Sequence, residues 1–262
     1  GEVRLPGDKS LSHRAALFGS LAEGASHVEN FLVAGVTRAM LQALEQLGVA
    51  WNLDGSTLTL SGEGISRFGG GGEEIPHLDC GNSATTLRLL AGAIVASGAG
   101  VVLDGSEGLR RRPMNRIVEP LRKMGVRIQS TGGRAPLRIE PASLPLSAVE
   151  HELNVASAQV KSCILLAGLS AYGPVIVREP GPSRDHTERM LRSMGVQVTG
   201  AVQMTPAGLV YETRLVPPEG PLKPLAVSLP GDFSAAAFLI VAGTITPGSE
   251  IRLLEVGLNP TR

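Results

Sequence analysis

The chain has 262 residues, with 33 glycines and 18 prolines but only five Phe, two Tyr and one Trp. This length predicts one or two domains with a core built from Leu, Val, Ile and Ala. The 24 Lys and Arg residues balance the 24 Asp and Glu residues, which argues against a nucleic-acid partner or an anionic membrane surface. Cys80 and Cys163 have no Cys or His neighbours at metal-ligand spacing, so we expect no metal site.

The sequence contains no run of 18 apolar residues and no N-terminal targeting pattern. These features predict a cytoplasmic protein that does not span a membrane. The chain opens abruptly on Gly1 and stops on residues 259–262, which resemble the start of a helix. We therefore expect the natural ends to lie elsewhere.

Four segments resemble one another, and they begin at Leu5, Leu78, Asn154 and Leu229. Their spacing is about 75 residues, longer than the common solenoid units. We expect three complete repeats at about 7–77, 78–153 and 154–228. These repeats form a predicted first domain over 7–228, and residues 1–6 and 229–262 are expected to be an incomplete part of a second domain. Each repeat is predicted to run strand, helix, strand, helix, strand, strand.

In the first repeat, the first helix is predicted to start at one of three capping residues, Asp8, Ser10 or Ser12. It is predicted to end at Gly24, and the second helix to run from near Thr37 to a stop at Gly48. Two alternating runs, 51–53 and 57–60, predict antiparallel strands. The polar residues at the first helix start are Lys9, Ser10 and Arg14. A flexible glycine loop is predicted at 68–72.

In the second repeat, Asn82 or Ser83 is predicted to open the first helix, and the second helix runs from Pro113 to a stop at Gly125. Strands are predicted at 101–103, 126–128 and 137–139. The polar residues near these helix starts are Asn82, Thr85, Thr86, Arg88, Arg110, Arg111 and Arg112.

In the third repeat, Ser157 opens the first helix, and the second helix runs from Ser183 to a stop at Gly195. Strands are predicted at 175–177, 196–198 and 209–211. The polar residues near the helix starts are Ser157, Gln159, Lys161 and Arg184. A linker at 217–224 leads to a fourth repeat, which is cut off after its first helix and next strand.

The polar residues recur at equivalent places, so we expect them to converge. Helix N-termini and added cations favour a small phosphorylated or carboxylated ligand. For any single Lys or Arg, the alternative is an ordinary solvated helix surface, and for Ser10, Ser83 and Ser157 capping is an equally good interpretation. Residues 7–10 lack the glycine before lysine that a nucleotide-binding P-loop needs. The histidines are interpreted as structural: His13, His27, His77, His151 and His186.

Six motifs resemble the 5-enolpyruvylshikimate-3-phosphate synthase family across the whole chain. They are LPGDKSLSHRA at 5–15, GNSATTLRLLAG at 81–92, RRPM at 111–114, SAQVKSCILLAGL at 157–169, SRDHTERML at 183–191 and GLNPTR at 257–262. The sister family, UDP-N-acetylglucosamine enolpyruvyl transferase, has a different N-terminal signature and a catalytic cysteine loop, and neither is found in this sequence.

The resemblance implies an α/β (α+β) fold. It is an inside-out barrel of repeated βαβαββ units with helices inside and sheets outside, and helix starts from two domains face a shared cleft. The resemblance also implies that the enolpyruvyl group of phosphoenolpyruvate is transferred to the 5-hydroxyl of shikimate 3-phosphate, with release of phosphate. No metal or organic cofactor is implied, and a monomer is expected at full length.

The family's motifs assign substrate contacts residue by residue. The residues implied for shikimate 3-phosphate are Lys9, Ser10, Arg14, Ser157, Ala158, Gln159 and Arg184. The residues implied for phosphoenolpyruvate are Lys9, Asn82, Ala84, Arg112 and Gln159. Lys9 is the catalytic residue expected in this chain, because the family's main catalytic Asp and Glu are expected beyond residue 262.

Two departures from the family pattern stand in these motifs. Ala84 replaces a frequent Gly, which leads us to expect reduced sensitivity to glyphosate. Ala158 replaces a common Ser, so one hydroxyl contact is expected to be missing. Asp232 is interpreted as a helix cap.

We expect this chain alone to bind shikimate 3-phosphate weakly and not to turn over. One alternative is a noncatalytic module that binds shikimate phosphate. Another is an enolpyruvyl transferase that acts on a different acceptor, such as UDP-N-acetylglucosamine.

Overall fold

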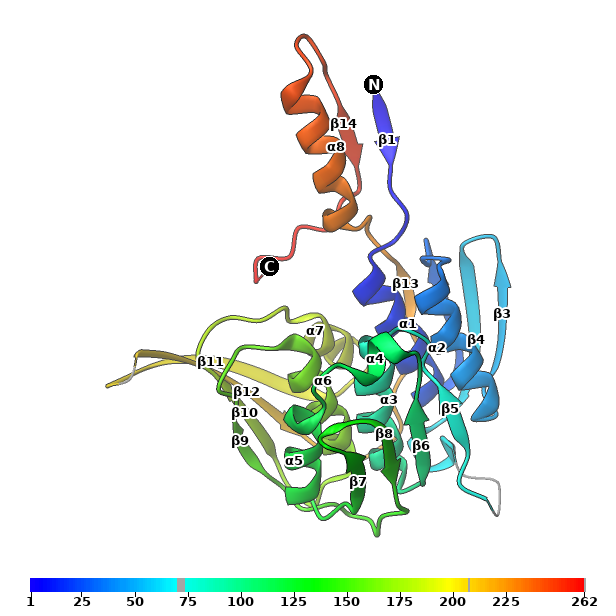
Figure 1. Ribbon diagram of the computed structural model, residues 1–262, viewed down its shortest axis with the longest axis vertical. Helices are drawn as coiled ribbons and strands as arrows, with labels where there is room; N and C mark the ends of the chain where they lie inside the picture. Colours follow the sequence, from blue (N-terminus) through cyan, green and yellow to red (C-terminus); the bar gives the residue numbers. More distant parts are fainter. Residues whose placement is uncertain (70–73, 207, 262) are drawn as a thin grey trace.

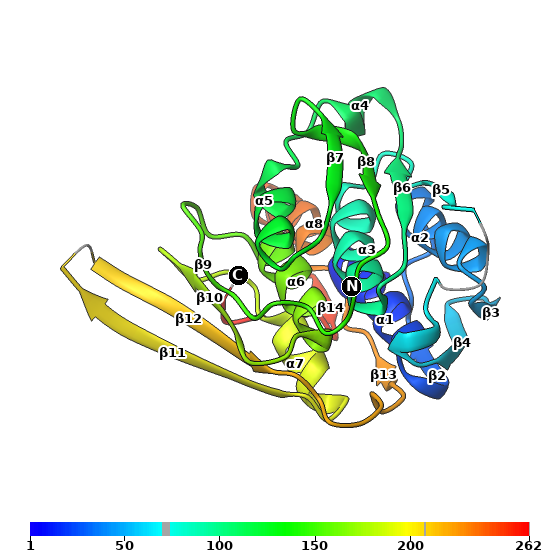
Figure 2. The same cartoon turned by 90° about the horizontal axis from the view of Figure 1, so that it is seen from below.

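The computed structural model describes residues 1–69, 74–206 and 208–261. In its larger part, sheets lie on the outside and helices fill the space between them (Figures 1 and 2). Most of the glycine loop predicted at 68–72 lies outside the described residues, as does Arg262, the last residue of the final motif. None of the helices in the described ranges is long and apolar enough to cross a membrane.

The first repeat forms α1 (Lys9–Leu21), β2 (Glu23–Glu29), α2 (Gly35–Gln46), β3 (Ala50–Asp54), β4 (Thr57–Glu63) and a 3-10 turn, η1 (Ile65–Arg67). Asp8 caps α1, since its carboxylate accepts a hydrogen bond from the backbone N–H of Leu11 at 2.9 Å. The predicted end of this helix at Gly24 is wrong. Ala22 is already extended, and Gly24 pairs with Gly62 of β4.

The second repeat forms β5 (His77–Asp79), α3 (Ala84–Ser97), β6 (Val101–Asp104), α4 (Glu107–Arg110), α5 (Asn115–Lys123), β7 (Ile128–Thr131) and β8 (Arg134–Ile139). Ser83 caps α3, as one of the two predicted alternatives required. The single-turn helix α4 was not predicted, and α5 starts two residues after Pro113. The strand predicted from Val126 starts at Ile128, because the N–H of Val126 still bonds back to the carbonyl of Leu121.

The third repeat forms β9 (Glu150–Glu152), α6 (Ala158–Ala167), η2 (Gly168–Ser170), β10 (Val175–Glu179), α7 (His186–Ser193), β11 (Gln197–Thr205) and β12 (Gly208–Val216). Ser157 precedes α6, as predicted. The second helix starts at His186 instead of Ser183, with Asp185 at its N-cap position. The β11–β12 hairpin is longer than predicted and projects from the body (Figure 2).

The three sheets share one design. Their strand orders are β13-β2-β4-β3, β5-β6-β8-β7 and β9-β10-β12-β11, where β13 is Ala226–Ser228. In each sheet the first two strands are parallel and the other neighbours are antiparallel. The first sheet therefore takes its outer strand from the end of the third predicted repeat, where Ala226 pairs with His27.

The first helix of each repeat is buried. Phe18 of α1, Ile94 of α3 and Ile164 of α6 are 0% exposed. The axes of α3 and α6 approach closely at Gly92, where a Cβ atom would lie 2.3 Å from the carbonyl oxygen of Cys163. A helix that is apolar on all sides must be covered on all sides. The sheets supply that cover, which confirms the predicted α/β fold class with helices inside and sheets outside.

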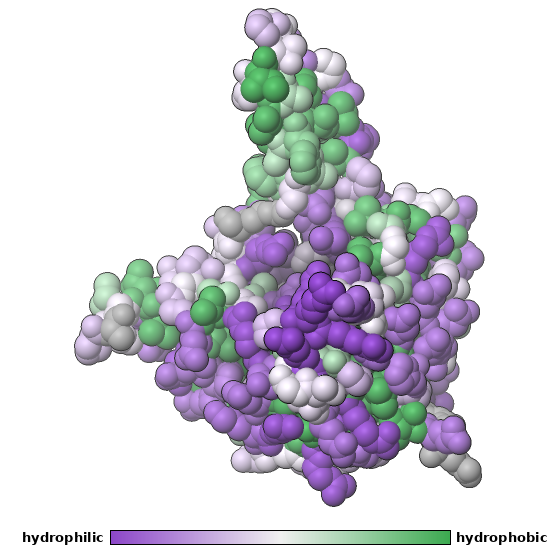
Figure 3. Space-filling view, in the orientation of Figure 1, coloured by the Kyte–Doolittle hydropathy of each residue, from purple (hydrophilic) through white to green (hydrophobic). Residues whose placement is uncertain are grey.

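A smaller part projects from the body and contains β1 (Glu2–Arg4), α8 (Phe233–Ile245) and β14 (Arg252–Leu254) (Figure 1). β1 and β14 are parallel partners, so a segment near the start of the chain pairs here with one near its end. The face of this part that Figure 3 shows is largely apolar. Phe238 is 80% exposed and Ile245 is 75% exposed.

Candidate functional site

The start of α1 presents Lys9 and Ser10 beside a fully engaged capping residue. Asp8 is 3% exposed and holds the N–H of Leu11. The side chain of Lys9 is exposed, and no hydrogen-bond or ion-pair partner for it lies among the described residues. Ser10 lies inside α1 and does not cap it, and its hydroxyl accepts a hydrogen bond from Arg14 at 2.6 Å. Of the three predicted caps, Asp8 is therefore the one that the chain uses.

Arg14 is the most deeply buried of the predicted site residues, at 1% exposure. Its Nε donates to Thr187 at 2.8 Å and its Nη2 donates to Ser162 at 2.7 Å. Burial lowers the pKa of this guanidinium to about 10, while the charge of nearby Glu188 raises it. Arg14 therefore ties the start of α1 to α6 and α7, and its contact with a substrate stays a prediction.

The start of α3 is joined to α1 through His13 and Ser83. Nδ1 of His13 lies 2.7 Å from the carbonyl oxygen of Lys9, and Nε2 lies 3.2 Å from the Ser83 hydroxyl. A carbonyl can only accept, so Nδ1 carries the proton and the Ser83 hydroxyl donates to Nε2. Burial lowers the pKa of His13, which favours this neutral form. Of the two interpretations of Ser83, the structure favours capping.

The predicted phosphoenolpyruvate residues Asn82 and Ala84 flank Ser83. Asn82 is exposed, and its side-chain oxygen accepts a hydrogen bond from Ser106 at 3.1 Å. Ala84 is only 3% exposed, so its methyl group packs mainly against protein. Asn82 is thus held by the segment that leads into α4, and Ala84 forms part of the wall behind it.

Arg88 and Gln159 connect α3 with α6. Arg88 donates both to the side-chain oxygen of Gln159 and to the carbonyl of Pro113 at 3.1 Å. The amide nitrogen of Gln159 donates to Thr85 at 2.9 Å. Burial lowers the pKa of Arg88, and the nearby charges of Arg116 and Arg112 lower it further. These bonds fix the Gln159 amide and bring the turn that carries Arg112 to the same side of the molecule.

The three consecutive arginines before α5 have different surroundings. Arg110 is paired with Asp104 by two hydrogen bonds of 2.8 and 2.5 Å, and Arg111 is paired with Glu107. Arg112 is exposed, without a side-chain partner in the described part of the chain. The expectation that all three stand at a helix start is wrong, because the inserted helix α4 places Arg110 in its last turn, where a cation is favourable.

The starts of α6 and α7 face a common cavity of about 520 Å³. It is lined by Ala156, Ser157, Ala158, Gln159, Pro182, Ser183, Arg184, Ser234 and Thr261. Ser157 occupies the N-cap position of α6 but makes no capping hydrogen bond with its side chain. Arg184 has no side-chain partner among the residues that the structure describes. A free hydroxyl, a free guanidinium and a helix start suit an anionic ligand.

A buried ion-pair cluster lies between α6, α7 and the end of β10. Lys161 contacts Glu179 at 2.9 Å and Glu188 at 2.7 Å, and all three side chains are at most 4% exposed. Burial by itself lowers the pKa of Lys161, but the two carboxylates outweigh burial and raise it. Lys161 recurs at a helix start in the sequence, yet the structure turns it inward. It therefore offsets protein carboxylates and does not reach the cavity surface.

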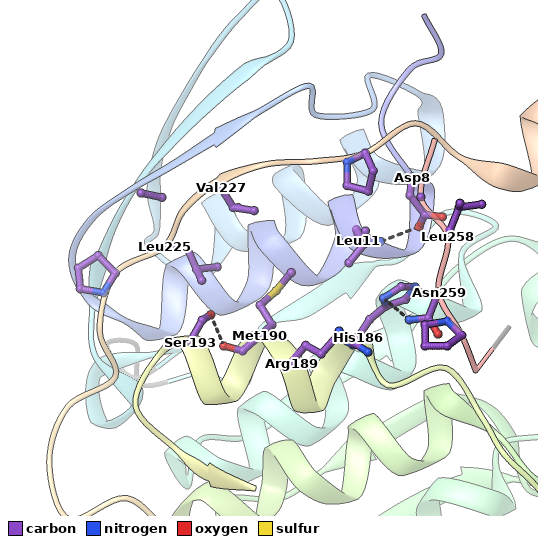
Figure 4. A pocket seen from close by; sticks show the side chains of 15 residues that line it. Asp8, Leu11, His186, Arg189, Met190, Ser193, Leu225, Val227, Leu258 and Asn259 are labelled. Atoms are coloured by element: carbon purple, nitrogen blue, oxygen red, sulfur yellow. Dashed lines mark hydrogen bonds between the residues drawn. The ribbon is translucent and has the colours of Figure 1, made fainter. Parts of the chain in front are cut away.

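A second cavity, of about 540 Å³, lies between α1, α7, β13 and the segment that follows β14 (Figure 4). Leu11, Met190, Leu225 and Val227 contribute to a lining that is mostly apolar. His186 borders this cavity, and burial together with the charge of Arg14 lowers its pKa to about 4. This lining does not suit a phosphorylated molecule, so the smaller, polar cavity is the candidate site. The described residues contain no cluster of three or more His, Cys, Asp or Glu side chains that could hold a metal.

The family model for EPSP synthase (3-phosphoshikimate 1-carboxyvinyltransferase) matches residues 1–262. The chain belongs to this family. It is 46% identical over 264 residues to the 3-phosphoshikimate 1-carboxyvinyltransferase of Coxiella burnetii, covering 100% of this chain and 57% of that protein. It is 47% identical over 266 residues to the Salinibacter ruber protein with the same name, covering 100% of this chain and 58% of that protein.

The solved structure of EPSP synthase from Acinetobacter baumannii is similar to this chain with a TM-score of 0.86 and 42% sequence identity. The similarity covers 100% of this chain and 57% of that structure. The chain thus spans just over half the length of the EPSP synthases that it matches. The resemblance inferred from the six motifs is confirmed.

The site residues predicted from the sequence do not include every polar residue of the cavity. Ser183, Ser234 and Thr261 also line it, and Glu179 accepts hydrogen bonds from the backbone of Ser157 and the hydroxyl of Ser183. Ser183 and Thr261 belong to the motifs at 183–191 and 257–262, and this position is the sequence signal that points to them. Glu179 ends a strand, and nothing in its local pattern distinguishes it from a surface carboxylate.

Proposed function

We propose that the protein to which this chain belongs transfers the enolpyruvyl group of phosphoenolpyruvate to the 5-hydroxyl of shikimate 3-phosphate and releases phosphate. The observation that carries this proposal is the polar cavity at the starts of α6 and α7, where neither the Ser157 hydroxyl nor the Arg184 guanidinium has a partner among the described residues. Membership of the EPSP synthase family supports it. We further propose that the protein acts in the cytoplasm as a monomer at full length, without a metal or organic cofactor.

In this proposal, shikimate 3-phosphate is held by Lys9, Ser10, Arg14, Ser157, Ala158, Gln159 and Arg184. Phosphoenolpyruvate lies against Lys9, Asn82, Ala84, Arg112 and Gln159. Residues 7–228 form the first domain, and residues 1–6 and 229–262 belong to the second. Two phosphorylated substrates repel each other, and unpaired cations with helix starts offset that repulsion while they fix the reacting atoms.

The chemistry needs no redox partner. The 5-hydroxyl oxygen of shikimate 3-phosphate loses its proton and forms a bond to the substituted carbon of phosphoenolpyruvate. The methylene carbon of phosphoenolpyruvate takes up a proton in the same step. The resulting tetrahedral intermediate then expels phosphate and loses a proton from its methyl group, which restores the double bond. Lys9, exposed at the start of α1, is the residue of this chain proposed to serve both substrates.

The acceptor is tested by titrating the chain separately with shikimate 3-phosphate and with UDP-N-acetylglucosamine in a calorimeter. We expect weak binding of shikimate 3-phosphate and no heat from the nucleotide sugar. The reverse preference would instead support a transferase acting on UDP-N-acetylglucosamine. A noncatalytic binding module is tested by the length of the open reading frame, because a gene that ends at residue 262 would favour it.

A further inference from the structure

One buried carboxylate contacts both walls of the polar cavity. Oε1 of Glu179 accepts a hydrogen bond from the backbone N–H of Ser157 at 2.7 Å, and Oε2 accepts one from the hydroxyl of Ser183 at 2.7 Å. Ser157 precedes α6 and Ser183 precedes α7. Glu179 itself ends β10 and is 2% exposed. A single side chain at the end of a sheet strand therefore holds the residues that precede both helices.

The same carboxylate is charge-compensated from the side away from the cavity. Lys161 lies 2.9 Å from Glu179 and also pairs with Glu188. Since Arg14 lies close enough to Glu188 for their charges to interact, the buried carboxylates are balanced by buried cations. An uncompensated carboxylate so near an anion site would repel the ligand. The pairing leaves the charge of Arg184 available to the cavity.

The hydrogen bonds to Glu179 also decide whether Ser157 and Ser183 can donate or accept a hydrogen bond toward the cavity. The Ser183 hydroxyl spends its only proton on Glu179, so toward the cavity it can only accept. The Ser157 backbone N–H is likewise occupied, whereas its hydroxyl has no partner in residues 1–69, 74–206 and 208–261 and can donate. Ser157 and Ser183 therefore give the cavity a hydroxyl that can donate and a hydroxyl that can only accept. That combination suits a ligand with both a phosphate and free hydroxyl groups.

We propose that Glu179, held by Lys161, is a positioning residue that orients Ser157 and Ser183 for a phosphorylated polyhydroxy acceptor. This inference rests on the proposed function for its ligand, shikimate 3-phosphate. Glu179 does not touch the ligand and acts through the two serines. The residue is absent from the substrate contacts inferred from the motifs.

The test compares Glu179→Gln with Glu150→Gln in the 262-residue chain. Glu150 lies on the adjacent strand β9, but its carboxylate is largely exposed and pairs with Arg178. Shikimate 3-phosphate is titrated into each variant at a temperature where circular dichroism shows the same folded fraction. We expect Glu179→Gln to weaken binding about tenfold to a hundredfold, the value of one charge-assisted hydrogen bond, and Glu150→Gln to change it less than about twofold. Equal affinity in the two variants overturns the proposal.

A double-mutant cycle distinguishes positioning from a general structural role. Ser183→Ala is expected to weaken binding less in the Glu179→Gln background than in the wild-type background, because the serine is already misplaced there. An identical fold-change in both backgrounds overturns the proposed route through Ser183.

A third measurement needs no ligand, so its outcome is independent of the proposed function. Amide hydrogen exchange at Ser157 should accelerate about tenfold or more in Glu179→Gln, while exchange at Leu165, deeper in α6, stays unchanged. Unchanged exchange at Ser157 overturns the proposal. Absence of shikimate 3-phosphate binding by the wild-type chain, together with faster exchange at Ser157, would refute the proposed ligand and leave the positioning contact standing.

Discussion

Replacing Arg14 by lysine removes a guanidinium that links three helices. Arg14 donates to side chains of α1, α6 and α7: Ser10 at 2.6 Å, Ser162 at 2.7 Å and Thr187 at 2.8 Å. A lysine ammonium is a point donor without the planar fork, so we expect it to satisfy one of these acceptors and to lose two. At roughly 1.5–3 kcal/mol for each hydrogen bond to a charged group, Arg14→Lys should lower the free energy of unfolding by about 3–6 kcal/mol.

The assay is urea unfolding of the 262-residue chain, followed by circular dichroism. The matched control is Arg189→Lys, which makes the same substitution in an exposed i,i+4 pair with Asp185 at 2.9 Å. That pair should contribute no more than about 0.5 kcal/mol. The two variants should therefore differ clearly in their midpoints while their slopes stay equal. A loss below about 1 kcal/mol for Arg14→Lys would refute the claim that its hydrogen bonds hold the helices together.

Three further predictions concern other parts of the chain. The folded state holds the pKa of His186 at about 4, below the ordinary value of 6.5 in the unfolded chain, so the stability that His186 contributes is complete above pH 6.5 and is lost as the pH falls toward 4. His186→Gln should therefore flatten the pH dependence of the free energy of unfolding over this range, and an unchanged pH dependence would contradict the low pKa. On α8, Phe238 is 80% exposed and Val241 is 56% exposed, so the chain should self-associate in sedimentation experiments. The double variant Phe238→Ser, Val241→Ser should associate less, and a wild-type chain that stays monomeric at high concentration would count against this prediction. Asn259 donates to Asp185 at 2.8 Å, so Asn259→Ala should increase protease cleavage of the segment after β14, and an unchanged cleavage pattern would show that this hydrogen bond does not anchor it.

Much of the fold was predictable because the same pattern of helices and strands repeats three times along the sequence. The helix starts at Asp8, Ser83 and Ser157 and the stops at Gly48, Gly125 and Gly195 follow local rules of capping and backbone conformation. Two features were beyond such rules. The short helix α4 has too few residues to show a periodicity, and the pairing of Ala226 with His27 joins segments that are distant in the sequence.

The candidate site was predictable in its membership more than in its geometry. The motifs point to Ser157, Gln159 and Arg184, and the structure places all three on one cavity. The sequence does not reveal that Arg14 and Lys161 turn inward. The local sequence pattern around a cation on a helix does not show whether its side chain faces water or a buried carboxylate. Only the packing of α1, α6 and α7 distinguishes cations that pair with protein groups from cations that are left to bind a ligand.

The central claim is that the cavity at the starts of α6 and α7 binds shikimate 3-phosphate through Arg184. The most direct measurement is calorimetric titration of this compound into the wild-type chain, Arg184→Ala and the control Arg127→Ala, which alters an exposed arginine beyond the far end of α5. We predict one site per chain, with binding weakened at least about tenfold by Arg184→Ala and changed less than about twofold by Arg127→Ala. Equal affinity for the wild-type chain and Arg184→Ala would contradict the account.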